Sequence, residues 1–187
     1  MIFIVFFSII ASIFLGFWHL FVYWLSIFAA PLKEPEMFWI VIPIWVNWFF
    51  TEFFVEKYGT TFGNAVSNGA IPILASLDWT RYLYRLLSDG YIRNSSGVFL
   101  KFALSIGIAL YGFFVILAGI KTNKIVFFIG RIRYITYVLL MATPIVYNVI
   151  KLNWYTLFTI MAFFPLYWWI VEILDRITPE PKVYHHK

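Results

Sequence analysis

A polar tract from Asn47 to Asn68 carries the side chains of this sequence that could do chemistry. Glu52 and Glu56 are four residues apart, so on a helix their carboxylates would lie on the same face. Inside a cavity, two neighbouring carboxylates could bind a cation or relay protons. Their mutual repulsion and the loss of water raise the pKa of one carboxyl group, which favours binding of a proton or a cation. The alternative is that the segment ends near Thr51 and leaves Glu56 among the lipid head groups, so Glu52 is the stronger candidate.

Hydroxyl and amide side chains continue the tract beyond the carboxylates. Thr60, Asn64 and Asn68 recur every four residues, which places them on one face of a helix. Such a stripe could line a pore or a pocket and offer oxygen and amide groups to an ion, water or a head group. The predicted residues that line the ligand or ion site are Glu52, Thr60, Asn64, Asn68, Asn47, Thr51 and Glu56.

Helix packing is the competing interpretation of the same stretch. Gly59, Gly63 and Ser67 also recur every four residues, beside the polar stripe. Small residues at this spacing are typical of close helix contacts in membranes, where Asn and Thr side chains also link helices. The two interpretations can hold together, on adjacent faces of one helix.

A second group of polar residues follows in the segment Asp78–Leu87. Its apolar side chains fall on one side of a helix, with Arg81 and Arg85 on another. This is the pattern of an amphipathic helix that lies in the membrane interface. We predict that Arg81 and Arg85 contact lipid head groups there.

The composition indicates the class of protein to which these residues belong. The chain is 63% hydrophobic and 12% charged, whereas a soluble domain averages about 25% charged residues. It has long runs without any charge: Met1–Leu32, Phe102–Ile120, Tyr134–Ile150 and Leu152–Val171. Because a spanning helix needs about 20 apolar residues, the chain is predicted to be a polytopic membrane protein.

The net charge of +5 does not indicate nucleic acid, because the basic residues fall between the spans, where they meet head groups. The absence of cysteine excludes disulfides and thiolate metal sites. We predict no catalytic residue, no metal ligand and no cofactor.

The predicted fold is an all-α transmembrane bundle that forms a single integral membrane domain over residues 1–187. It has five spans, a polar re-entrant or sixth helix at Gly59–Leu77, and the interfacial helix at Asp78–Leu87. The predicted segments are 2–30, 37–56, 59–77, 98–120, 134–150 and 153–174. The connections on the side of the C-terminus hold more Lys and Arg, which predicts a cytoplasmic C-terminus. A glycosylation acceptor sequence at Asn94 would lie on the opposite side.

From these residues we expect a small membrane protein that binds and passes a cation or small polar solute through a site lined by the 47–68 tract. One alternative is a non-catalytic subunit of a larger membrane complex, and another is a membrane enzyme that acts on lipid head groups. The expected partners are the lipid bilayer, the ion or solute, and copies of the chain or other subunits, without nucleic acid.

Overall fold

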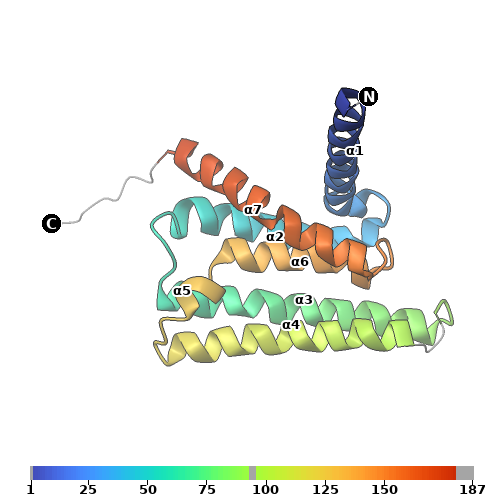
Figure 1. Ribbon diagram of the computed structural model, residues 1–187. Helices are drawn as coiled ribbons and strands as arrows, with labels where there is room; N and C mark the ends of the chain where they lie inside the picture. The colour runs from blue at the N-terminus through green and yellow to red at the C-terminus, as the bar shows by residue number, and fades with distance from the viewer. Residues whose placement is uncertain (1, 93–95, 180–187) are drawn as a thin grey trace.

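The computed structural model describes residues 2–92 and 96–179, and that part of the chain is helical throughout (Figure 1). The long helices are α1 (Ile2–Phe28), α2 (Phe38–Phe50), α3 (Phe62–Ser88), α4 (Ser96–Ile120), α6 (Ile132–Val146) and α7 (Trp154–Ile177). The short elements are η1 (Ala30–Leu32), η2 (Pro35–Met37), the π-helix η3 (Thr51–Val55) and α5 (Val126–Ile129). The predicted all-α bundle is confirmed. The acceptor at Asn94 lies outside the described residues.

Four stretches of the described chain are long and apolar enough to cross a membrane: Ala11–Phe28, Pro35–Val55, Ser96–Ile120 and Trp154–Ile177. α6 is a shorter apolar helix. Lipid cannot satisfy backbone polar groups, so a chain of this composition forms helices that satisfy them internally. These stretches correspond to four of the five predicted spans, and the fifth, 134–150, overlaps the shorter helix α6.

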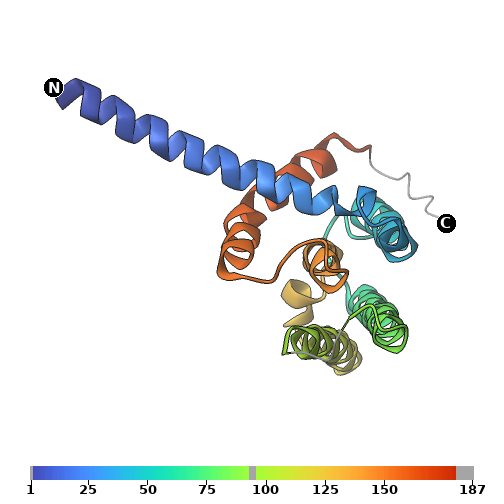
Figure 2. The same ribbon diagram turned by 90° about the vertical axis from the view of Figure 1, so that its right-hand side faces the viewer.

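The helices α2, α3, α4 and α6 run side by side, and α7 lies obliquely over α6 (Figures 1 and 2). α1 crosses them, and its N-terminal part extends away from the bundle. α6 is the centre, with contacts to α1, α2, α3 and α7, and nearly all of its side chains are buried. Its polar side chains, among them Arg133 and Thr143, are buried with the apolar ones.

α3 and α4 form a long antiparallel pair in which the backbones approach closely (Figure 1). A Cβ atom on Gly112 would lie 2.5 Å from the carbonyl oxygen of Gly69, so only glycine fits at this crossing. The predicted ridge of small residues is not this contact. Gly59 precedes the helix with φ of 111°, and Gly63 has no neighbouring helix within 4 Å of its Cβ position.

The structure differs from the prediction in the segment 59–87, where one helix replaces two. α3 is continuous for 27 residues, through Pro72 and Asp78. It begins at Thr61, whose side-chain oxygen accepts a hydrogen bond from the Asn64 amide at 3.1 Å. Because α4 packs along α3, the helix does not need to end where its composition changes. The prediction of a separate interfacial helix at Asp78–Leu87 is therefore wrong, because the polar segment 59–77 continues into it as one helix.

Candidate functional site

The carboxylates of the polar tract lie at the end of α2, where the helix widens into a single π-turn. The Glu56 amide donates to the carbonyl of Thr51 at 2.7 Å, five residues back, and closes the wide turn η3. π-turns of this kind often mark functional positions. Glu52 and Glu56 are both fully buried, and both face the start of α6, as their spacing predicted for a common face.

Glu52 forms an ion pair with Arg133, and neither side chain has any exposed surface. Arg133 Nε donates to Glu52 Oε1 at 2.9 Å, and Nη1 donates to Glu172 Oε2 at 3.1 Å. Arg131 lies 3.4 Å from the same Glu52 oxygen, and Arg176 Nε donates to Glu172 at 3.3 Å. We call Glu52, Arg131, Arg133, Glu172 and Arg176 the charged cluster.

The charged cluster joins three helices at one end of the bundle. It links the end of α2 through Glu52, the start of α6 through Arg133 and the end of α7 through Glu172. The guanidinium of Arg133 also lies 5.5 Å from the ring centre of Trp168. A buried arginine that is paired on both sides and packed on an aromatic ring is largely compensated for its loss of water. This arrangement stabilises a fixed geometry.

Glu56 serves a different purpose, because its carboxylate caps the start of α6. Oε2 accepts a hydrogen bond from the Ile132 amide at 3.0 Å, and Oε1 accepts one from Asn68 Nδ2 at 2.7 Å. The same Asn68 nitrogen donates to the carbonyl of Gly130 at 2.9 Å. The first amides of a helix lack partners and favour a negative charge. Burial nevertheless raises the pKa of Glu56 above its ordinary value, and the Ile132 amide partly offsets that rise.

Lys57 completes the polar end by reaching the last turn of α7. Its Nζ donates to the backbone carbonyls of Asp175, at 2.8 Å, and of Thr178, and it lies 3.9 Å from the Asp175 carboxylate. The last carbonyls of a helix lack amide partners, and a cation there is favourable. The turn after η3 therefore supplies an anion to the start of one helix and a cation to the end of another.

The remaining residues of the predicted site do not converge with Glu52 and Glu56 on one hollow. Asn47, Thr51, Thr60 and Asn64 are all half-buried. The Asn47 amide nitrogen, the Thr60 hydroxyl and Glu52 Oε2 are buried atoms without a hydrogen-bond partner. Neither of the two hollows described for the structure is lined by a residue of the tract. Of the predicted stripe, Asn68 donates to the buried Glu56 carboxylate, and Thr60 lies close enough to that carboxyl to help lower its pKa, whereas Asn64 does not reach it.

The arginines expected at lipid head groups each form an ion pair within the protein. Arg81 Nη2 lies 2.8 Å from Asp78, and Arg85 pairs with Glu36. The other oxygen of Asp78 accepts a hydrogen bond from the Tyr147 hydroxyl at 2.7 Å. Both arginines remain exposed, so contact with head groups stays a prediction.

Sequence reasoning missed the basic partners of the tract, Arg131 and Arg133. Both were counted only as charges of a connecting segment. A signal was present, because Arg133 stands one residue before a charge-free run and would enter the bundle with it. Its partner Glu52 is 81 residues away in the sequence, and spacing along the chain cannot reveal such a pair.

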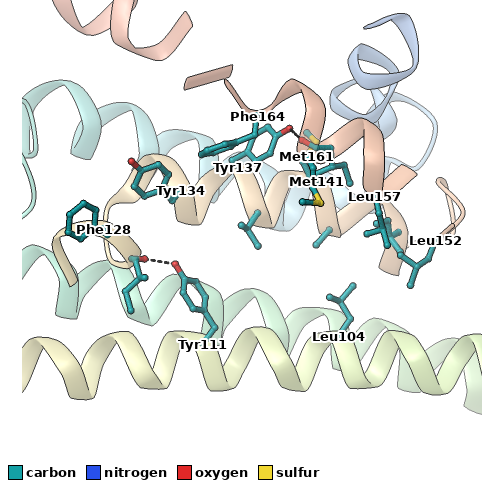
Figure 3. A pocket seen from close by; sticks show the side chains of 15 residues that line it. Leu104, Tyr111, Phe128, Tyr134, Tyr137, Met141, Leu152, Leu157, Met161 and Phe164 are labelled. Atoms are coloured by element: carbon teal, nitrogen blue, oxygen red, sulfur yellow. Dashed lines mark hydrogen bonds between the residues drawn. The ribbon is translucent and has the colours of Figure 1, made fainter. Parts of the chain in front are cut away.

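An apolar groove of about 720 Å³ lies on the side of α6 away from α2. Figure 3 shows α4 as one wall, α6 as the floor and α7 as the other wall. Phe128 and Tyr134 stand at one end, and Leu104 and Leu152 at the other. We call this hollow the apolar groove.

Two of the three tyrosines that line the apolar groove have hydroxyls bonded to the protein. Tyr111 donates to the carbonyl of Ile129, and Tyr137 donates to the carbonyl of Ile160 at 2.6 Å (Figure 3). The third is Tyr134, and the rest of the lining is made of Leu, Ile, Val, Met, Ala and Phe side chains. The groove can therefore offer an occupant little beyond apolar contact.

No set of three or more His, Asp or Glu side chains within residues 2–92 and 96–179 is arranged to hold a metal ion. Comparison of the chain with models of protein families, with curated proteins and with solved structures found no match. What the chain does must therefore follow from its own geometry.

Proposed function

We propose that this chain is an integral membrane protein that binds a membrane lipid by seating one of its hydrocarbon chains in the apolar groove. The observation that carries the proposal is the groove itself, an apolar hollow of about 720 Å³ between helices of membrane-spanning character. Ligand sites in proteins have volumes of roughly 300–1,000 Å³ and are mostly apolar. At bilayer depth the molecules available to fill such a hollow are lipid chains and the helices of other proteins.

The groove is long and its lining is apolar. Its lining residues on α6 run from Tyr134 to Ile145, which at 1.5 Å per residue is a length of about 16 Å. A flexible hydrocarbon chain can fill a hollow of this length by apolar contact alone. We therefore take a lipid chain as the occupant, and a helix of another copy is the alternative that the experiment below tests.

Filling the groove tests the proposal. Val138 lines the groove from α6 with its side chain 40% exposed, so Val138→Trp would occupy the space of the occupant. Leu110 on α4 is 63% exposed and does not line the groove, so Leu110→Trp is the matched control. We expect native mass spectrometry of the full chain from phosphatidylglycerol–phosphatidylcholine nanodiscs to show bound lipid in the wild type and the control, with loss in Val138→Trp.

Two results would overturn the proposal. One is equal lipid retention in Val138→Trp and Leu110→Trp. The other is a lipid-free oligomer that Val138→Trp alone disrupts, which would place a helix of another copy in the groove.

Permeation of a cation or small polar solute through the 47–68 tract stays a prediction, and so do the subunit and enzyme alternatives. Permeation is supported only by buried polar atoms without partners, such as Glu52 Oε2 and Asn47 Nδ2. The ion pair of Glu52 with Arg133 supports a packing role instead.

We further propose that the end of the bundle with the charged cluster faces the cytoplasm. α3 runs antiparallel to both α2 and α4 (Figure 1), so Lys57 lies at the same end as the basic segment 121–133. A surplus of basic residues favours the cytoplasmic side. Because the chain has no cysteine, single Lys124→Cys and Asp89→Cys variants can be labelled from either side of intact cells. If an impermeant reagent labels Lys124→Cys from outside the cells, the orientation is the opposite of the one proposed.

A further inference from the structure

Basic residues stand at both ends of the apolar groove. At the end with Phe128, Arg131 and Arg133 are paired with Glu52, and the exposed Lys121 and Lys124 lie in the connection before α5. At the end with Leu104 and Leu152, two lysines stand beside the groove. Neither forms an ion pair with a carboxylate in the described part of the chain.

Lys101 is the better placed of these lysines. It lies one turn before Leu104 on α4, so both side chains share the face that borders the groove. Its Nζ donates to the side-chain oxygen of Asn148, in the connection between α6 and α7. That contact places the ammonium beside the connection that follows α6.

Asn148 is held in an unusual conformation that fits this contact. Its φ is 62°, in the left-handed region that asparagine tolerates better than most residues. Its amide donates to the carbonyl of Ile145 at 3.3 Å, which closes the turn after α6. The amide oxygen is neutral, so it orients the ammonium of Lys101 without cancelling its charge. An ammonium has three N–H donors, and Asn148 uses one of them.

Lys151 adds a second positive charge at the same end. It directly precedes Leu152, which lines the groove, and its side chain is exposed. Lysines near the ends of spans reach toward the interface with their ammonium groups while their stems stay in apolar surroundings. Both ammonium groups are therefore available to an anion at the level where an apolar chain in the groove would end.

We propose that the occupant of the apolar groove is an anionic phospholipid whose phosphate binds Lys101 and Lys151, with its hydrocarbon chain directed along α6 toward Phe128. This inference rests on the proposed function and adds the class of head group and the direction of the lipid. A lysine near an anionic membrane surface contributes about 1 kcal/mol of attraction, which corresponds to about a fivefold preference for the anionic lipid.

Lipid competition tests the inference. The full chain is placed in nanodiscs of equal parts phosphatidylglycerol and phosphatidylcholine, and native mass spectrometry measures the ratio of the two retained lipids. We expect the wild type to retain phosphatidylglycerol preferentially, and Lys101→Gln to lower that preference about fivefold while total lipid is unchanged. Lys101→Arg keeps the positive charge and should keep the preference. Lys151→Gln should also lower the preference, so this variant tests the inference if Lys101→Gln fails to fold.

The matched control is Lys124→Gln, an exposed lysine at the opposite end of the bundle, which should leave the preference as in the wild type. The inference is overturned if Lys101→Gln and Lys151→Gln both retain the wild-type ratio, or if Lys124→Gln shifts it instead. Those results leave the proposed function intact, because lipid is still bound. Equal retention of lipid by Val138→Trp and the wild type would overturn both.

Discussion

Neutralising Glu52 should cost far more stability than neutralising an exposed member of the same charged cluster. Glu52 and Arg133 have no exposed side-chain surface, so Glu52→Gln leaves a buried guanidinium with less compensation. Breaking a buried ion pair by removing one partner costs about 3–5 kcal/mol. Since Arg133 keeps Glu172 at 3.1 Å, we expect a loss near the lower limit, about 3 kcal/mol.

The control is Arg176→Gln, which removes the exposed end of the cluster. The Arg176 side chain is 76% exposed and pairs with Glu172 one turn away, an arrangement that contributes about 0.3–0.5 kcal/mol. Unfolding of the purified protein in mixed micelles with increasing dodecyl sulfate, followed by tryptophan fluorescence, gives the free energy of unfolding for each variant.

A double variant separates the ion pair from other effects of the substitution. Arg133→Met combined with Glu52→Gln removes both buried charges. The combined loss should therefore be smaller than the sum of the single losses, with a coupling of about 0.5–3 kcal/mol. If Glu52→Gln costs no more than Arg176→Gln, the carboxylate is hydrated in the membrane. The packing role would then be wrong, and a permeation path through Glu52 would regain support.

Three further predictions concern the frame around the cluster. Gly112→Ala should destabilise the α3–α4 pair by about 1–3 kcal/mol, because the new Cβ would lie 2.5 Å from a backbone oxygen. The control is Gly107→Ala, which has open space at its Cβ position and should stabilise the same helix in the same unfolding assay. Asn68→Ala should cost about 1–3 kcal/mol of stability, because the Glu56 carboxylate and the Gly130 carbonyl lose their shared donor. The control is Ser67→Ala on the exposed face, which should change stability by less than about 0.5 kcal/mol. Burial raises the pKa of Glu56, so the folded state binds the proton of this carboxyl more tightly than the unfolded chain does. The contribution of Glu56 to stability is therefore complete below pH 4.5 and is lost as the pH rises through the raised pKa. A Glu56→Gln variant whose stability has the same pH dependence as the wild type would contradict this.

The helices were predictable from the sequence because the bilayer leaves so few alternatives. A charge-free run must form a helix there, and the expected span 98–120 agrees closely with α4 at Ser96–Ile120. The inward direction of Glu52 was also predictable, because lipid excludes a carboxylate from the outer face. Glu56, which had a place among the head groups as its alternative, is fully buried as well.

The partners of those carboxylates were not predictable, because they depend on how distant helices pack. Arg133 meets Glu52 only because α2 lies against α6, and no local pattern contains that contact. The continuity of α3 has a similar origin. Pro72 is an ordinary signal for the end of a helix, and Asp78 is one for the start of another. The close crossing of Gly69 and Gly112 nevertheless keeps α3 and α4 together past both.

The apolar groove was the least accessible feature, because it is a space between elements. Its lining residues, such as Leu104 and Met161, are what any lipid-facing helix would carry. Only the failure of α4 and α7 to meet makes them the walls of one hollow.

That separation of α4 from α7 requires a physical cause, and the polar contacts supply one. Apolar helices in lipid gain by packing together, so a groove between them closes unless other contacts hold its walls. Arg133 and Glu172 hold α7 to the start of α6, and the Tyr137 hydroxyl holds α7 to α6 again at Ile160. The Arg133 guanidinium is fully buried, so its bond to Glu172 fixes where the end of α7 lies. The charged cluster thereby also sets the position of the helix that forms one wall of the groove. Under the proposed function, the polar tract that first suggested a passage for ions supports a site for lipid.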